Sequence, residues 1–468
     1  MRKLISIFIC LFVVIVCQGR IITVGHFSRS GGVHYDFDTI QAAIDDSNDG
    51  DEIIVAKGGY GENINFKGKN VILRSADPND SDVVAETIID GRWKGHVVTL
   101  ASGEDANCVL DGFTIINGDA DSGGGVFCSG TKPTIRNCII RDNTVEHYGG
   151  GIFSEGLGMD QPGDGPTITK CIVQHNAAYG GGPCGGGIWS NTSLTITDCL
   201  IMKNSALYSG GIQLGGKRPK IYKCIIKDNV STYAHGQFGG GIVLYGSSCS
   251  AEISNCLIVG NKGNGFFSEL GYPFYPHPII TNCTISGNTK GGISVNSEVD
   301  VSNSIVWGNS GSQIHPDSPW SEVDVKYSDV QGSWSGEGNI DADPCFVRPG
   351  YWNPNRLPYD TSDDLWVDGD YHLKSQAGRW DPNGKSWVLD DVTSPCIDAG
   401  NTRSPIDYEP PPNGGIINMG AYGGTAEASK TYFNKPLCKA FVPGDINGDC
   451  IVNIKDFAIM AYHWLEER

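Results

Sequence analysis

The residues best suited to chemistry lie near the C-terminus, in the stretch from Gly444 to Phe457. Calcium takes six to eight oxygen ligands, and a short loop with oxygen-bearing side chains at alternate positions can supply them. Loop positions 1, 3, 5, 9 and 12 carry Asp445, Asn447, Asp449, Asn453 and Asp456, and the backbone carbonyl of Ile451 falls at position 7. This spacing predicts a calcium-binding loop followed by a short α-helix. An acidic turn without an ion is the alternative.

Aromatic residues recur at one position of successive segments and suit a sugar ligand. Phe127, Phe153 and Trp189 each follow the first apolar residue of a glycine-led segment. The loops that enter these segments carry tyrosines, namely Tyr148, Tyr179, Tyr208 and Tyr233. An exposed apolar stripe usually marks a binding surface, so these seven residues are predicted to bind substrate. Alternatively, the tyrosines pack over the other aromatic side chains and seal the structure.

No group of residues identifies a catalytic centre, so the catalytic residues stay unassigned. A lyase acting on uronic acids needs a cation to neutralise the sugar carboxylate and a base to remove the adjacent proton. Basic residues do gather, but in no recognisable lyase pattern: Lys220, Lys223, Lys227, Arg136 and Arg141. A hydrolase would need neighbouring aspartates, which the aromatic segments lack. One long loop holds acids that would bind a metal or form a solvated turn: Glu155, Asp160 and Asp164.

The elements that position these residues are built by a repeat. Seven segments share a centre, an apolar residue three positions before it, another two positions after it, and an asparagine five positions after it. The centres are Cys138, Cys171, Cys199, Cys224, Cys256, Cys283 and Ser304. The asparagines are Asn143, Asn176, Asn204, Asn229, Asn261, Asn288 and Asn309. An eighth, weaker copy begins at Leu110.

The spacing within each copy predicts a strand, a bend and a second strand. The centre and the residue two positions later share one side of a strand, whereas the residue three positions earlier is out of phase with it. A bend must lie between them, and four copies have an asparagine there, a residue that tolerates left-handed backbone: Asn137, Asn255, Asn282 and Asn303. A third strand follows each glycine-led loop. Each repeat is then one turn of a coil, and stacked turns bury a continuous core.

This coil determines how the cysteines are interpreted. Six of them occupy one inward column, where parallel side chains suit buried thiols better than disulfides. The asparagine column is predicted to form a hydrogen-bonded ladder. We expect a capping helix over residues 38–47, with Asp38 as its N-cap and Ile40, Ala43 and Ile44 facing the coil. The region from Asp341 to Ser429 is expected to form irregular final turns and a C-terminal cap.

The N-terminus predicts export. Arg2 and Lys3 precede an apolar stretch from Leu4 to Val16 that is too short to span a bilayer comfortably, which is typical of a signal peptide. Cleavage after Gly19 is expected, with acylation of Cys17 as the alternative. The predicted organisation is a signal peptide over 1–19, the coil with its caps over 20–430, a linker over 431–441 and the calcium segment over 442–468. No later segment is apolar enough to cross a membrane.

The formal net charge of −19 argues against nucleic acid as a partner. An anionic sugar remains compatible with an acidic surface if calcium bridges the two. The predicted secreted or cell-surface location and the aromatic stripe together favour an extracellular polysaccharide as the partner, with an anionic one preferred.

From about residue 21 to 429 the chain resembles the pectate-lyase-like superfamily of right-handed parallel β-helix proteins. The resemblance is carried by the repeat, by the opening phrase Thr39-Ile-Gln-Ala-Ala-Ile44, and by the closing phrases around Cys396 and Met419. It implies an all-β, right-handed parallel β-helix. The superfamily includes polysaccharide lyases, glycoside hydrolases, esterases, epimerases and non-catalytic adhesins, so the resemblance implies a fold more than a reaction.

The calcium loop, with aspartate at position 12, resembles a dockerin repeat. Dockerins attach secreted carbohydrate-active enzymes to cohesin partners. Here Cys450 stands at position 6, where a glycine is usual, and one copy is present instead of two. The resemblance therefore implies calcium binding more directly than cohesin binding. Cys438 and Cys450 are candidates for a disulfide in this small module.

Two functions follow. The first is a secreted enzyme acting on an acidic polysaccharide, as a lyase or a glycoside hydrolase. The second is a non-catalytic, adhesin-like protein that binds glycan or spans distance outside the cell.

Overall fold

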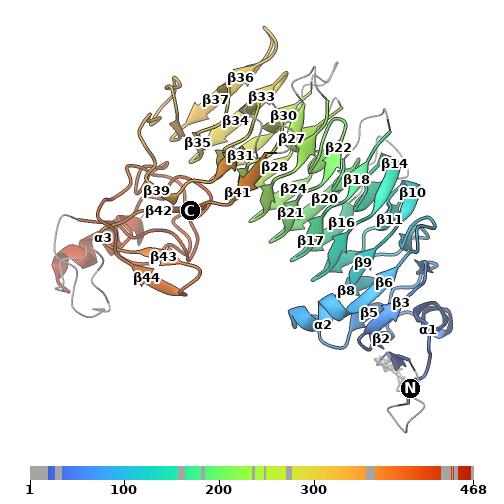
Figure 1. Ribbon diagram of the computed structural model, residues 1–468. Coiled ribbons are helices and arrows are strands. Elements are labelled where there is room, and N and C mark those ends of the chain that lie inside the picture. Colours follow the sequence, from blue (N-terminus) through green and yellow to red (C-terminus); the bar gives the residue numbers. More distant parts are fainter. Residues whose placement is uncertain are drawn as a thin grey trace, which may run out of the picture.

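The computed structural model describes residues 19–26, 34–156, 164–180, 185–233, 238–246, 249–269, 277–354, 364–433, 444, 446 and 452–464. Its strands stack in parallel along one axis, from the blue N-terminal end to the yellow end of the stack (Figure 1). Each turn of the chain adds one strand to each of three long sheets, so the predicted coil is confirmed as a parallel β-helix.

Sheet A contains the strands that precede each repeat centre. Among the described residues it has twelve: β1 (Ile21–Val24), β2 (Glu52–Val55), β5 (Ile72–Ser75), β8 (Val109–Asp111), β12 (Thr134–Arg136), β16 (Asp164–Thr169), β20 (Ser193–Thr197), β24 (Lys220–Tyr222), β28 (Glu252–Ser254), β31 (Ile279–Thr281), β34 (Glu298–Ser302) and β37 (Glu322–Lys326).

Sheet B contains the strands that follow each centre. In the described part of the chain these are β3 (Gly58–Tyr60), β6 (Thr87–Asp90), β9 (Thr114–Ile116), β13 (Ile139–Arg141), β17 (Ile172–Gln174), β21 (Leu200–Met202), β25 (Ile225–Lys227), β29 (Leu257–Val259), β32 (Thr284–Ser286), β35 (Ile305–Trp307) and β38 (Asp329–Val330).

Sheet C contains the glycine-led strands that carry the aromatic residues. Those described are β4 (Ile64–Asn65), β7 (Val98–Leu100), β11 (Val126–Ser129), β15 (Ile152–Glu155), β19 (Ile188–Ser190), β23 (Ile212–Leu214), β27 (Gly239–Leu244), β30 (Asn264–Ser268), β33 (Gly291–Val295) and β36 (Ser312–Pro316).

Sheet D is a short fourth sheet between sheets B and C, which the sequence pattern did not predict. It consists, within the described residues, of β10 (Asp119–Ser122), β14 (Thr144–Tyr148), β18 (Ala177–Ala178), β22 (Ser205–Ala206) and β26 (Val230–Ser231). Val145, Ala178 and Ala206 stack as a small buried cluster behind it. Its three residues lie on β14, β18 and β22, the strands that contain or closely precede Tyr148, Tyr179 and Tyr208.

The bends form where they were predicted, and a second set occurs one strand later. Asn137, Asn255, Asn282 and Asn303 have φ values between 49° and 53°. The residue before each ladder asparagine is also left-handed, as at Asp142 and Asp228, where φ is 56° and 52°. Two left-handed residues per turn therefore set the corners of the coil.

The asparagine ladder is confirmed and continuous from Asn143 to Asn309. Each side-chain amide donates to the amide oxygen of the next rung, and the backbone N–H donates to the same oxygen; Asn229 Nδ2 and N lie 3.0 and 3.1 Å from Asn261 Oδ1. The same Nδ2 lies 2.9 Å from the carbonyl oxygen of Ile201 on the preceding rung. Because the ladder residues from Asn143 to Asn288 are fully buried, these bonds satisfy polar groups that water cannot reach.

The cysteine column is also confirmed as a stack of free, buried thiols. Each Sγ lies near backbone carbonyl oxygens, as at Cys256, whose Sγ is 3.2 Å from the carbonyl oxygen of Ser254. Burial raises the pKa of the Cys256 thiol well above its ordinary value. Because every thiol of the column is buried, reagents in solution cannot reach it, and the column should be chemically inert in the folded protein.

We therefore expect the six column cysteines to resist alkylation until the protein unfolds. Of the cysteines that the structure describes, Cys345 alone is not buried, so it should react first. Brief treatment with iodoacetamide, followed by peptide mass spectrometry, measures this order, and the urea-unfolded chain is the control. Native labelling of Cys199 at the rate of Cys345 would contradict the assignment.

The N-terminal cap forms with a different capping residue from the one predicted. Helix α1 (Ile40–Asp46) begins after Thr39, whose side chain accepts from the N–H of Ala42, so the prediction of Asp38 as N-cap was wrong. The carboxylate of Glu62 accepts two further N–H groups at this end, from Ile40 and Gln41. A contact 22 residues away thus supplements the local cap. Helix α2 (Ser81–Glu86) flanks sheet B nearby.

The segment after residue 340 does not form the predicted end cap. It turns back along the coil and covers the bend between sheets A and B (Figure 1). We call residues 341–433 the strap. Its described strands are antiparallel pairs: β39 (Phe346–Arg348) with β42 (Asp370–Leu373), β40 (Tyr351–Asn353) with β41 (Leu365–Val367), and β43 (Arg379–Asp381) with β44 (Ser386–Val388).

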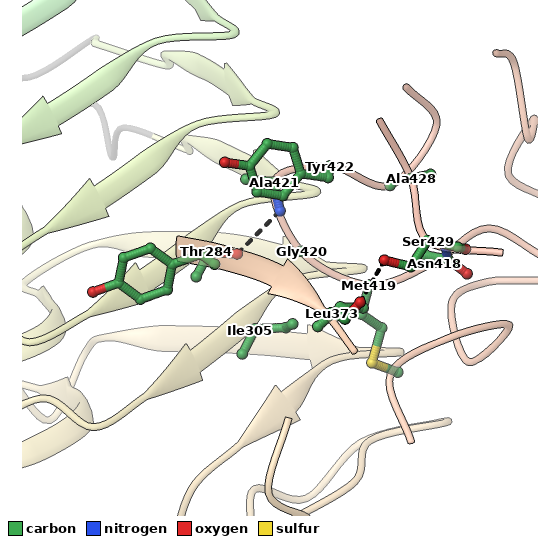
Figure 2. A pocket seen from close by; sticks show the side chains of 12 residues that line it. Thr284, Ile305, Leu373, Asn418, Met419, Gly420, Ala421, Tyr422, Ala428 and Ser429 are labelled. Carbon is green, nitrogen blue, oxygen red and sulfur yellow. Dashed lines mark hydrogen bonds between the residues drawn. The ribbon is translucent and has the colours of Figure 1, made fainter. Parts of the chain in front are cut away.

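Hydrogen bonds and aromatic packing attach the strap to the coil. Asn255 Nδ2 donates to the carbonyl oxygens of Ala421 and Gly423 at 3.1 and 2.8 Å. Figure 2 shows the neighbouring contact, in which the N–H of Ala421 donates to Thr284 Oγ1 at 3.1 Å. The Trp366 ring packs against Gly260 so closely that a Cβ there would lie 2.1 Å from the ring. The strap is thus an integral part of the coil's flank.

Candidate functional site

The predicted aromatic residues form a continuous stack on sheet C. The rings of Phe127 and Phe153 are 5.2 Å apart and inclined by 9°, and those of Phe153 and Trp189 are 4.7 Å apart and inclined by 5°. Parallel pairing of β11, β15 and β19 places the three residues in register. The prediction that they share one line on consecutive rungs is confirmed.

The middle of this stack is covered, and Tyr148 is the predicted tyrosine that packs on it. Phe153 and Trp189 are only 5% and 7% exposed, and the Tyr148 ring lies 4.9 Å from that of Trp189. Tyr208 and Tyr233 are half-buried and pack on Phe238. The sealing arrangement therefore describes these side chains, and their role in substrate binding stays a prediction. Tyr179, which is 65% exposed, presents its side chain to solvent.

A cluster able to hold a metal lies beside these tyrosines. Asp121 on β10 and Glu146 and His147 on β14 place ligand atoms within 4.8 Å of one another. Carboxylate and imidazole groups are common ligands of divalent cations. The parallel pairing of β10 with β14 shifts register between Ala120 and Ser122, which brings Asp121 to the neighbouring strand. The repeat columns could not reveal this cluster, because it depends on that local irregularity.

The other acidic and basic residues singled out by the sequence do not join this cluster. Glu155 Oε1 accepts from Ser129 Oγ at 2.9 Å, while Asp160 and the side chain of Asp164 lie outside the described residues. Most of the basic residues are paired with acids elsewhere: Arg136 with Asp111, Arg141 with Asp142, Lys220 with Glu252, and Lys227 with Asp368. Of this set, Lys223 lies over the ring of Tyr222 instead, at 4.9 Å.

The predicted calcium loop is described only in part. Asp445, Asn447, Asp449 and Ile451 lie outside the described residues, as do Cys438 and Cys450. Asp456 is 1% exposed, and its carboxylate accepts from the N–H groups of Ile446 and Asn453 at 2.7 and 2.8 Å. Helix α3 (Ile454–Trp464) begins just after Asn453, where a helix was expected. The side chain at position 12 therefore ties the two ends of the loop together.

Comparisons with known proteins agree with the coil. Residues 152–275 match the family described as right handed beta helix region, and residues 361–400 match a family described as disaggregatase related. No curated protein matches the chain. The crystal structure of pectate lyase Pel9A is similar, with 15% identity and a TM-score of 0.52 over 86% of this chain and 96% of that chain.

Two further solved structures have lower scores. Pectin methylesterase from carrot is 12% identical, with a TM-score of 0.32 over 66% of this chain and 88% of that one. The alginate lyase from Paenibacillus sp. str. FPU-7 is 11% identical, with a TM-score of 0.26 over 61% of this chain and 94% of that one. No helix in the described part of the chain is long and apolar enough to span a bilayer. The likeness shows the fold, and the chain is a right-handed parallel β-helix built from three long parallel sheets.

Proposed function

We propose that this protein is secreted, binds an anionic extracellular polysaccharide along sheet D and cleaves it as a polysaccharide lyase. The observation that carries the proposal is the cluster of Asp121, Glu146 and His147, which lies on the same edge of the coil as the exposed Tyr179. Pectate lyase Pel9A, whose coil is similar, is named for action on an acidic polysaccharide.

The chemistry of an acidic chain explains why a cation is central. With a net charge of −19, this protein repels a polyuronate at long range. A divalent cation held by Asp121, Glu146 and His147 would bridge the protein to a sugar carboxylate. The same cation would withdraw charge from that carboxylate and acidify the adjacent carbon, which is one of the two requirements of a β-elimination, the other being a base that takes the proton. Tyr179 would stack on a neighbouring ring of the polysaccharide.

A non-catalytic, adhesin-like glycan-binding protein is the second candidate. The observation that favours it is the pairing of Arg136, Lys220 and Lys227 with acids on other faces of the coil, which leaves none of them as a base beside the cluster. In this alternative the same edge binds the polysaccharide without cleaving it. A glycoside hydrolase would also need a pair of carboxyl groups across the glycosidic bond.

The C-terminal segment is inferred to bind calcium as a separate module. The support is the ligand spacing together with the buried carboxylate of Asp456, which accepts from both sides of the loop. Docking to a cohesin-like protein would use the same module. Removal of a signal peptide at Gly19 would deliver both parts outside the cell, where calcium is abundant.

The test is to incubate the protein with polygalacturonate and alginate, with and without calcium, and to follow new unsaturated ends by ultraviolet absorbance. We expect calcium-dependent cleavage. In the double variant Asp121→Asn, Glu146→Gln, cleavage should fall by at least about tenfold, because losing metal ligands costs at least as much as losing their outer-shell partners. Glu322→Gln, at an exposed acid on β37, is the matched control and should leave the rate unchanged.

Binding is measured on the same samples by affinity electrophoresis through gels that contain each polysaccharide. Binding without cleavage, lost in the double variant, would replace the lyase by the adhesin-like candidate. The absence of both binding and cleavage would rule out both.

A further inference from the structure

A cleft of about 320 Å³ lies between the coil and the strap. One wall is the bend between sheets A and B at Asp198 and Lys223, with Ile225 and Leu257 beside it. The other wall is the strap segment that contains Tyr422 and Glu427. Its volume lies within the range of small-molecule sites, which begins at roughly 300 Å³.

The bend residues change character where the cleft begins. On the rungs that the strap covers, the left-handed position is held by Asn255, Asn282 and Asn303, and each forms a side-chain hydrogen bond with the strap. On the preceding rungs the same left-handed position is held by charged residues, Lys170, Asp198 and Lys223. Asparagine suits this backbone better than lysine. Charged side chains at the mouth of the cleft therefore point to a polar ligand.

The two charged residues of the coil wall are available to such a ligand. Asp198 is exposed and Lys223 is half-buried, and no ion pair within the described residues engages either of them. The Lys223 ammonium lies over the ring of the exposed Tyr222, a contact that leaves its N–H groups able to donate. Between them and the strap, Ile225 presents an apolar surface that is 38% exposed. The wall thus combines an acceptor, a donor and an apolar floor, the combination that a polyhydroxylated ring with apolar C–H faces requires.

The strap wall contributes a carboxylate that is held from behind. His372 is 2% exposed; its Nδ1 lies 2.6 Å from Asp370 Oδ1, and its Nε2 lies 3.4 Å from Glu427 Oε2. The imidazole also stacks on the Tyr422 ring at 3.7 Å. Burial lowers the pKa of His372, but the hydrogen bonds and charges of Asp370 and Glu427 raise it by more, so the pKa of His372 lies above its ordinary value. The His372 side chain thus orients Glu427 from behind as a hydrogen-bond acceptor at the cleft wall.

We propose that this cleft binds one uncharged sugar unit of a glycan, with Asp198 and Glu427 accepting from its hydroxyl groups and Lys223 donating to them. The charges of these three side chains sum to one negative charge, which disfavours a uronate and suits a neutral ring. The proposal rests on the proposed function only for the ligand class, a glycan. The anionic chain binds at sheet D, and the neutral unit binds in this cleft.

The probes are the methyl β-glycosides of galactose, glucose and xylose, with methyl galacturonide as the charged comparison, and binding to the full-length protein is followed by saturation-transfer NMR. We expect saturable transfer to at least one neutral glycoside. Lys223→Asn should weaken it by about tenfold or more, the value of one hydrogen bond to a charged group. Lys170→Asn is the matched control, because it makes the same change at the same bend outside the cleft, and binding should be unchanged.

Ala426→Trp provides a second, independent test, because Ala426 is exposed at the cleft wall and a large ring there fills the site without disturbing the core. Transfer that persists in Ala426→Trp, or transfer to methyl galacturonide alone, would overturn the proposal. So would the absence of transfer to every neutral glycoside. Polygalacturonate binding in gels separates this failure from that of the proposed function: if it persists, only the cleft assignment fails.

Discussion

Replacing Asn229 by leucine should destabilise the protein by about 3–5 kcal/mol. In the native ladder, Asn229 Oδ1 accepts from both the N–H and the side-chain amide of Asn204, and Asn229 Nδ2 donates to the carbonyl oxygen of Ile201. Asn229 Nδ2 also donates to Asn261 Oδ1. Leucine is similar in size but offers no polar atom, so all four buried hydrogen bonds are lost. Each unsatisfied buried group costs about 1–3 kcal/mol, and water cannot compensate at a residue that is fully buried.

The measurement is the urea midpoint of unfolding at fixed pH, followed by circular dichroism, with the slope checked because long repeats can unfold in parts. Asn79→Leu is the matched control, since it makes the same chemical change at an exposed asparagine. It should alter stability by no more than about 0.5 kcal/mol. If Asn229→Leu and Asn79→Leu had equal urea midpoints, the ladder would contribute nothing measurable to the stability of the coil.

The ladder and the thiol column were predictable because they follow from local spacing alone. A residue at the centre, its partner two positions later and a third residue out of phase can be reconciled only by a bend, and the bend fixes which side chains point inward. Stacking then brings equivalent residues of successive turns together, whatever the loops between them do. This is why Cys171 and Cys199 are neighbours although 28 residues separate them.

The strap could not be predicted, because its contacts join positions that no repeat relates. Asn255 and Gly423 are 168 residues apart, and nothing in either segment specifies the register of their pairing. One part of this contact is visible in the sequence, as the asparagines at the bend. Left-handed backbone alone does not require asparagine there, because Lys170 and Lys223 adopt the same conformation. What Asn255 adds is an amide that bonds to the strap.

In the candidate site too, some features follow from local spacing and others depend on contacts that the repeat does not specify. The direction of Phe153 and Trp189 followed from strand periodicity, whereas their burial depends on where β14, which ends at Tyr148, lies relative to them. The cluster of Asp121, Glu146 and His147 depends on the pairing of two short strands in sheet D with a shift of register. The candidate site therefore lies in loops and irregular strand pairs outside the repeat columns, and sequence periodicity says least about those positions.

The strap should lose stability as pH rises from about 4.5 to 7, because of Glu409. This residue is 5% exposed, and its Oε1 accepts from the N–H groups of Asn418 and Gly424, both at 2.8 Å. Burial, reinforced by the charges of Asp398 and Asp407, raises the pKa of Glu409 to about 7 against the opposing effect of those two hydrogen bonds. Burial also raises the pKa of Asp398 to about 6.

The sign follows from the proton balance. Between the ordinary glutamate pKa of about 4.5 and the folded value of about 7, the folded protein holds a proton that the unfolded chain has released. The stabilisation is therefore complete below about pH 4.5 and is lost as pH rises through about 7. A shift of this size corresponds to about 3 kcal/mol.

Glu409→Gln isolates this contribution, because the amide keeps an oxygen to accept from Asn418 and Gly424 but cannot ionise. We expect the free energy of unfolding of the wild-type protein to be lower at pH 8 than at pH 5. In the variant this difference should be smaller by about 3 kcal/mol, and at pH 8 the variant should be more stable than the wild type. Urea unfolding at the two pH values measures the difference, and proteolysis of the strap under native conditions locates it. Glu322→Gln, at an exposed acid, should preserve the wild-type pH dependence. If Glu409→Gln left the pH dependence unchanged, Glu409 would be ionised in the folded strap. Its carboxylate would then be stabilised by some interaction other than the two hydrogen bonds from Asn418 and Gly424.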